Sequence, residues 1–194
     1  MAVLSALFFL PFSTTAQTEF IINAGINSSA FDNELNDGNR FDEGRVGWNA
    51  GFDLRFGSDN VIFLQTGARY NEFTARLFRL DVDDVNVNFE QRTKFRTIKL
   101  PLNAGINFIE NDYIDLYGVV GLVPTALLDN DEVAEVDFDD DDIRNISLGA
   151  DAGIGIDLFN IVNLYLNYEV GLTDFFEGRE ARINMFTAGV GIIF

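Results

Sequence analysis

Polar and apolar residues alternate with a period of two along most of the chain. The clearest stretch is 45–56, in which one parity is apolar throughout and the other is charged, polar or glycine. Side chains of a β-strand point to alternate sides, so this pattern predicts a strand with two unlike faces. The apolar face comprises Val46, Trp48, Ala50, Phe52, Leu54 and Phe56.

The same alternation recurs in eight segments of roughly ten residues, the length that a tilted strand needs to cross a hydrocarbon core. The pattern is least clear in the fifth segment, where Val119 and Val123 disturb the parity. Residues 72–92 alternate weakly and suggest a strand extension, whereas 125–144 is expected to be a loop. The eight segments are 20–27, 45–56, 62–71, 98–108, 113–123, 146–158, 162–172 and 186–194.

Connections between these segments alternate between long polar stretches and short turns such as 57–60. This rhythm predicts an all-β fold over residues 17–194, an eight-stranded antiparallel up-and-down transmembrane β-barrel. Closure would leave no strand edge exposed to lipid, and the even strand number would place both mature termini in the periplasm. Pro101 interrupts the fourth segment and predicts a bulge, with its ring facing the lumen.

The alternative is a soluble, lipocalin-like ligand-binding barrel with its apolar face inward. Gly, Asn and charges of both signs dominate the polar parity, however, and such residues suit a narrow lumen better than a solvated surface. Aromatic residues near the strand ends, among them Trp48, Tyr70 and Tyr168, suit an interfacial girdle, as do Phe56 and Phe194. We expect the lumenal cations Arg45, Arg55, Arg69 and Lys99 to pair with Asp53, Asp151, Asp157 and Glu169.

Residues 1–16 predict a secretory signal peptide that ends near Ala16. A short apolar core, 3–12, is followed by small residues at Thr14 and Ala16. No Lys or Arg precedes that core, so either the true start lies upstream, which we favour, or the segment is a membrane-facing strand. Residues 1–16 contain no charged side chain, so their removal would leave the net negative charge of the chain unchanged.

Composition limits the chemistry. The 194 residues carry a formal charge of −18 and contain neither Cys nor His. The acidity argues against nucleic acid, which requires clustered Lys and Arg. Without His, neither Ser-His nor Cys-His nucleophilic catalysis nor a His-ligated metal is available. No carboxylate pair stands out as an acid–base couple, so we expect no enzymatic activity and no cofactor.

An acidic segment, 129–142, is the most conspicuous local feature. The simplest interpretation is a solvated external loop. Closely spaced carboxylates also suit Ca²⁺ or Mg²⁺, although the segment lacks the glycine and terminal Glu of an EF-hand. Binding of a protein partner is the third possibility. The candidate metal ligands are Asp129, Asp131, Asp137, Asp139, Asp140, Asp141 and Asp142.

Five stretches carry a family resemblance: IKLPLNAGI, LYGVVGLVP, SLGADAGIGIDL, LYLNYEVGLTDF and the terminal TAGVGIIF. With them the chain resembles Bacteroidetes-type "porin family" outer-membrane barrels, which are OmpA/OmpX-like and eight-stranded. The resemblance implies a bacterial outer-membrane location and carries no catalytic residues. Some relatives act in protein secretion, and most have no assigned activity.

We therefore expect a small, monomeric, integral outer-membrane protein. Eight strands leave an interior that side chains just fill, so the lumen should be plugged. Its role would be structural or would involve binding through external loops. Outer-membrane lipid is the expected partner, with divalent cations or a protein at the loops. A narrow porin for small solutes is the alternative function.

Overall fold

A computed structural model describes residues 17–33, 46–58, 60–79, 89–111, 113–132, 146–173 and 181–194. None of these residues forms a helix that is long and apolar enough to cross a membrane. The described residues form nine strands: β1 (Thr18–Asn33), β2 (Val46–Phe56), β3 (Ile62–Arg79), β4 (Phe89–Lys99), β5 (Leu102–Ile109), β6 (Ile114–Glu132), β7 (Ile146–Leu158), β8 (Val162–Gly171) and β9 (Ala181–Ile193).

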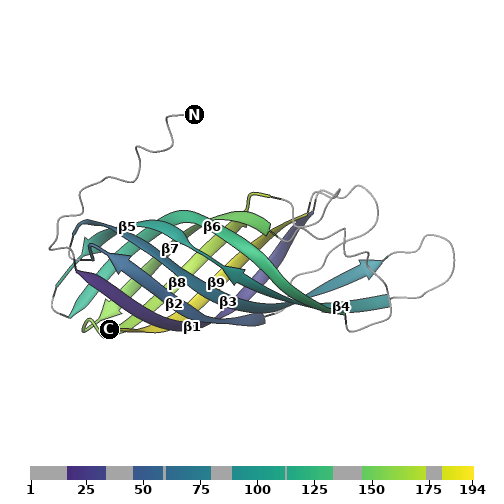
Figure 1. Ribbon diagram of the computed structural model, residues 1–194, viewed down its shortest axis with the longest axis horizontal. Coiled ribbons are helices and arrows are strands. Elements are labelled where there is room, and N and C mark those ends of the chain that lie inside the picture. Colours follow the sequence, from purple (N-terminus) through teal and green to yellow (C-terminus); the bar gives the residue numbers. More distant parts are fainter. Residues whose placement is uncertain are drawn as a thin grey trace, which may run out of the picture.

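The strands form a closed antiparallel barrel (Figure 1). Apart from β4 and β5, which do not pair with each other, consecutive strands pair, and β1 pairs with β9 to complete the circle. β4 and β5 lie end to end between β3 and β6, so together they occupy one of eight strand positions. The predicted eight-stranded up-and-down barrel is confirmed.

The strands are staggered, which sets their tilt. Cross-strand partners can be followed once around the barrel, from Glu19 through Arg55 and on to Met185. They lead back to β1 at Ser29. This is a shift of ten residues. With about 3.3 Å per residue and about 4.8 Å between strands, it corresponds to a tilt of about 40°. About ten tilted residues then cover about 25 Å, the height of an outer-membrane apolar band.

The apolar parity faces outward. Val120, Ile26 and Leu102 expose 61 %, 60 % and 57 % of their surface, whereas Asn49 and Asp53 in the lumen expose 1 % and 3 %. The soluble, lipocalin-like orientation is therefore wrong. Several apolar side chains also point inward and fill the lumen, which explains the disturbed parity of the fifth segment. Among them are Phe63, Tyr117, Val119, Val123 and Tyr165.

Pro101 breaks the strand without forming a bulge. The register against β3 is the same on both sides of it, since Arg69 pairs with Lys99 and Thr66 with Leu102. The predicted bulge is therefore wrong. The ladder is interrupted because Pro101 has no N–H, and because Pro124, which accepts a bond from Leu100, cannot donate one in return. The Pro101 ring is buried in the lumen, as predicted.

Beyond their pairing with β2 and β7, strands β3, β4 and β6 continue at the end away from Phe194 (Figure 1). β3 reaches Arg79 and β4 begins at Phe89, so most of 72–92 extends the strands, as its weak alternation suggested. β6 continues to Glu132, which is the partner of Thr93. The expected loop at 125–144 therefore starts later than predicted, because pairing with β4 prolongs the strand.

Candidate functional site

The barrel lumen holds a network of charged side chains that come from six of the strands. They occupy the inward-facing positions of the strands. Side chains alternate between the two faces of a strand, so polar residues face inward where their apolar neighbours face outward. We call this group the lumenal charge network. Its members are Glu19, Asp53, Arg55, Arg69, Lys99, Asp151, Asp157 and Glu169.

The layer nearest the termini is centred on Arg55. Its Nη1 atom lies 2.5 Å from Asp157 Oδ2 and 2.9 Å from Glu19 Oε2. Its guanidinium also lies 5.0 Å from the ring centre of Phe63 and 4.4 Å from that of Tyr117. Because Arg55 is on β2 and Asp157 on β7, on opposite sides of the barrel, this layer crosses the lumen.

A second layer crosses the middle of the lumen. Arg69 Nη2 lies 2.6 Å from Asp53 Oδ2 on the neighbouring strand. The same guanidinium lies 5.0 Å from the ring centre of Tyr165, which projects from β8 opposite. Tyr165 Oη in turn donates a 3.3 Å hydrogen bond to Asn49. Asn23 donates to Asp53 at 2.9 Å.

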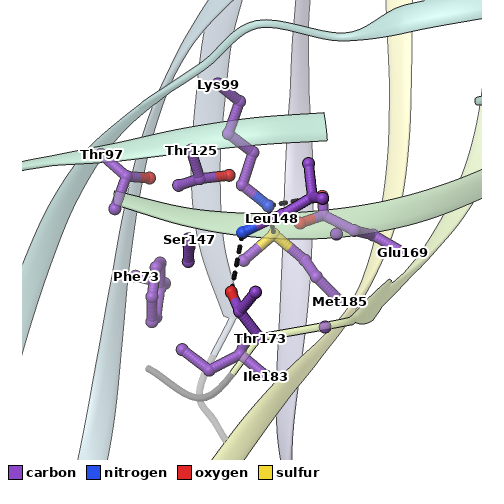
Figure 2. A pocket seen from close by; sticks show the side chains of 12 residues that line it. Phe73, Thr97, Lys99, Thr125, Ser147, Leu148, Glu169, Thr173, Ile183 and Met185 are labelled. Carbon is purple, nitrogen blue, oxygen red and sulfur yellow. Dashed lines mark hydrogen bonds and ion pairs between the residues drawn. The ribbon is translucent and has the colours of Figure 1, made fainter. Parts of the chain in front are cut away.

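The third layer brings together Lys99, Glu169 and Met185 (Figure 2). Lys99 Nζ lies 2.6 Å from Glu169 Oε2 and 3.4 Å from the sulfur of Met185. These residues adjoin an apolar cluster in which the rings of Phe73 and Phe95 stack 5.6 Å apart.

Two small cavities adjoin the Lys99–Glu169 pair, and both residues line each of them. The cavity toward the loop end has a volume of about 30 Å³ and the other about 20 Å³. Each has room for a water molecule or two, since one water needs about 10–15 Å³ measured in this way. The lumen is filled by side chains, as predicted from the strand number.

Most of the predicted ion pairs form. Arg55, Arg69 and Lys99 pair with Asp157, Asp53 and Glu169, whereas Arg45 lies outside the described residues.

Asp151 differs from the prediction. Its Oδ2 accepts hydrogen bonds from the amides of Asn103 and Asn167, and within the described chain it makes no ion pair. Sequence reasoning also missed Glu19, because the first strand was expected to start at Phe20, whereas β1 starts at Thr18. Glu19 shares the parity of the inward-facing Ile21 and Asn23, and this signal would have found it.

Most of the acidic segment 129–142 lies outside the residues that the structure describes. Asp137, Asp139, Asp140, Asp141 and Asp142 lie outside the described residues. Asp129 and Asp131 belong to the end of β6, where their cross-strand partners on β4 are Arg96 and Lys94. Within the described ranges no group of three or more His, Cys, Asp or Glu is placed to hold a metal ion. Cation binding stays a prediction.

Aromatic side chains mark both ends of the apolar band. Near the termini the Phe20 ring lies 5.7 Å from that of Phe52 and 6.4 Å from that of Phe194. Toward the loop end the rings of Trp48 and Tyr70 lie 5.3 Å apart. Aromatic rings at these two levels match the interfacial girdles of membrane barrels, and at the loop end the rings of Trp48 and Tyr70 are also amphipathic.

Comparison with families of known proteins agrees with this geometry. No protein with a curated description matches the sequence. The profile of the outer membrane protein beta-barrel domain matches residues 15–177. The family match does not show the Bacteroidetes origin that the resemblance suggested.

Solved structures of outer-membrane barrels superpose on most of the chain. OprG from Pseudomonas aeruginosa has a TM-score of 0.55 and 11 % identity, covering 92 % of this chain and 97 % of its own. Neisserial surface protein A has a TM-score of 0.53 and 14 % identity, with coverages of 90 % and 97 %. The outer membrane enzyme PagL has a TM-score of 0.56 and 10 % identity, with coverages of 89 % and 98 %. At such identities the likeness establishes the fold alone.

Proposed function

Because the chain belongs to the outer membrane protein beta-barrel domain family, we propose that this small integral protein of the bacterial outer membrane is a non-conducting barrel that presents binding loops outside the cell. The strands that flank the four connecting segments 34–45, 80–88, 133–145 and 174–180 have these ends on the side of the barrel away from Phe194. In this proposal residues 1–16 are removed on export. Both mature termini then face the periplasm.

The observation that carries the proposal is the closure of the lumen at three levels. Arg55–Asp157, Arg69–Tyr165 and Lys99–Glu169 each reach between strands that are not neighbours. Removing one partner of a buried ion pair lowers the free energy of unfolding by about 3–5 kcal/mol. Two of the three layers hold such a pair across the lumen, and the third is closed by the contact of Arg69 with the Tyr165 ring. Opening all three together is therefore costly, and this supports a plug rather than a diffusion pore.

Single-channel recording distinguishes the plugged barrel from the narrow-porin alternative. The purified protein is inserted into planar bilayers, and liposome swelling with small sugars is measured in parallel. The proposal expects no steady conductance and no swelling above empty liposomes. Steady, reproducible conductance steps from the folded protein would defeat it in favour of the porin.

The orientation requires a separate experiment. An epitope is inserted into 133–145 in one variant and after Phe194 in another. On intact cells, antibody should label only the first variant, and permeabilised cells should label with both. Labelling of the C-terminal epitope on intact cells would reverse the proposed orientation.

We also propose that the protein is not an enzyme. The structure of PagL belongs to an outer-membrane enzyme with a similar fold, so the fold by itself does not decide the matter. The absence of His removes the usual base for nucleophilic catalysis. In the lumenal charge network Asp53, Asp151 and Asp157 are buried, and Glu19 and Glu169 are half-buried in ion pairs, so none is placed at an open rim. Turnover of an ester or a peptide by the purified protein would contradict this.

Divalent cations at the acidic segment remain a second candidate for the loops. Adding Ca²⁺ to the purified barrel should raise its melting temperature, because ligands that bind only the folded state stabilise it. The shift should disappear when Asp139, Asp140, Asp141 and Asp142 are all replaced by Asn. A shift that survives this replacement would place the cation elsewhere.

A further inference from the structure

Two prolines meet in the barrel wall where β4 ends and β5 begins. On the β6 side, Leu100 donates its N–H to the carbonyl oxygen of Pro124 at 2.9 Å. Residues in such an antiparallel pair exchange two hydrogen bonds, but Pro124 has no N–H with which to return the second. The Leu100 carbonyl therefore lacks its partner in the ladder with β6.

The β3 side of the same strand position lacks a bond as well. The register places Pro101 opposite Gly67. Asn107, an even number of residues further along β5, donates its N–H to Val61 O on the β3 side. A residue with an N–H in place of Pro101 would donate to Gly67 in the same way, because N–H groups alternate in direction along a strand. We call the place formed by Leu100, Pro101 and Pro124 the proline break.

The proline break lies beside the loop-end edge of the apolar band. Ile98, two residues before Leu100, is the cross-strand partner of Tyr70 in the aromatic girdle. The outward side chains around the break are aliphatic, and Leu100 and Leu122 expose 47 % and 46 % of their surface. A carbonyl without a donor is costly in hydrocarbon, whereas water is available at the adjacent headgroup level. The missing bonds therefore favour local opening of the wall toward the interface.

Both lumenal cavities lie directly behind the proline break. Lys99 and Pro101 line the smaller one together with Val123, the residue before Pro124. Lys99 also lines the larger one, together with Thr125 on the other side of Pro124 (Figure 2). The interrupted ladder thus separates the lipid interface from the two cavities of the lumen.

We propose that the proline break is a side entrance through which small uncharged molecules pass between the outer-leaflet interface and the cavities beside Lys99. Local opening breaks fewer ladder bonds here than at an intact pair. The size of the cavities limits the occupants to water and solutes of similar size. The lumen stays closed from end to end, because the layers of Arg69 and Arg55 lie below. This inference rests on the proposed insertion of the barrel in the outer membrane.

A single introduced thiol can report on access, because the chain contains no cysteine. Val123→Cys places this thiol behind the break. Val119→Cys is the matched control on the same inward face of β6, since the two valines expose only 3 % and 4 % of their surface. Val119 lies in a continuous ladder, opposite Gly105 and Gly153. The full chain is folded into phosphatidylcholine vesicles, and mass spectrometry follows modification by methyl methanethiosulfonate, a small neutral thiol reagent.

The Val123→Cys thiol should react about tenfold faster than the Val119→Cys thiol, since one ladder hydrogen bond changes the population of the open wall by about this factor. Adding Pro124→Ala returns the missing N–H to β6 and should slow the reaction of Val123→Cys about tenfold. Adding Pro101→Ala instead returns a donor to β3 and should act in the same direction. Heat-modifiable migration on a gel checks that each variant is folded.

Hydrogen exchange gives a second measurement that needs no cysteine. The Leu100 amide makes the remaining bond at the break, so NMR should show that it exchanges about tenfold more slowly in Pro124→Ala than in the wild type. An unchanged exchange rate would show that Pro124 does not weaken the wall and would overturn the proposal.

The other outcomes separate the side entrance from the proposed function. A reaction of Val123→Cys that is independent of both prolines would overturn the entrance, because the reagent would then arrive through the loop end. Equal rates for Val123→Cys and Val119→Cys would also overturn it. Both results leave the non-conducting barrel standing. A negatively charged methanethiosulfonate, added outside sealed vesicles, tests the barrel itself, since rapid modification of Val119→Cys would show an open lumen.

Discussion

Arg55 on β2 and Asp157 on β7 form a buried ion pair across the whole width of the barrel. The two residues are 102 positions apart in the chain, and their side chains expose only 3 % and 4 % of their surface. Asn163 donates a second hydrogen bond to the Asp157 carboxylate, and Glu19 also contacts Arg55. The pair therefore ties opposite walls of the barrel together through Arg55 Nη1, while Nε and Nη2 of the same guanidinium are buried without a hydrogen-bond partner.

Replacement of Arg55 by Ala should lower the free energy of unfolding by about 3–5 kcal/mol, because it leaves buried carboxylates without a cation. The double variant Arg55→Ala with Asp157→Ala should lose less than the sum of the two single variants. Urea unfolding in lipid vesicles, followed by Trp48 fluorescence, measures all three. Additive losses would show that the two side chains are not coupled.

Glycine at 155 is required by the ring that lies against it. A Cβ added to Gly155 would lie 2.1 Å from the Tyr117 ring, which Arg55 and Asn163 hold in place. Gly155→Ala should therefore cost about 1–3 kcal/mol of stability through overpacking. Gly118→Ala is the matched control, since its Cβ would lie 3.0 Å from the lipid-facing Phe108 ring and at an ordinary contact distance of 3.7 Å from the Gly153 carbonyl oxygen. Equal losses in the two variants would contradict the packing argument.

The cost of a charge on the outer surface should depend on depth. Val120 lies midway along the outward positions of β6 and Val46 lies at the loop end of β2, and both are exposed. Val120→Lys should destabilise the barrel in lipid by about 2–4 kcal/mol, and Val46→Lys by about 0–1 kcal/mol. Folding into vesicles at increasing urea measures both. Similar costs would argue that these residues do not face a bilayer.

Removal of the upper layer alone should not open a pore. Lys99→Ala leaves Glu169 without its cation and should lower the free energy of unfolding by about 3 kcal/mol. The layers of Arg69 and Arg55 remain below, so bilayer recordings should still show no steady conductance. Conductance steps in this variant would show that the lower layers do not close the lumen.

Periodicity alone predicted the architecture, because a barrel in a membrane imposes one rule on every strand. Each strand must place apolar side chains toward lipid and polar ones inward, so the alternation shows in each segment separately. The same rule placed Arg55, Arg69 and Lys99 in the lumen. Their pairing with acids followed from the cost of leaving a buried charge alone.

The sequence by itself therefore determined which residues face lipid, which face the lumen and how many strands close the barrel. Only the tertiary structure decided which lumenal residues meet, because contacts across the lumen depend on the ten-residue stagger accumulated around all the strands. That stagger pairs Arg55 with Asp157 and leaves Asp151 to two amides. It also prolongs β6 to Glu132 beside β4. No single strand carries this information, since register is a property of the closed sheet.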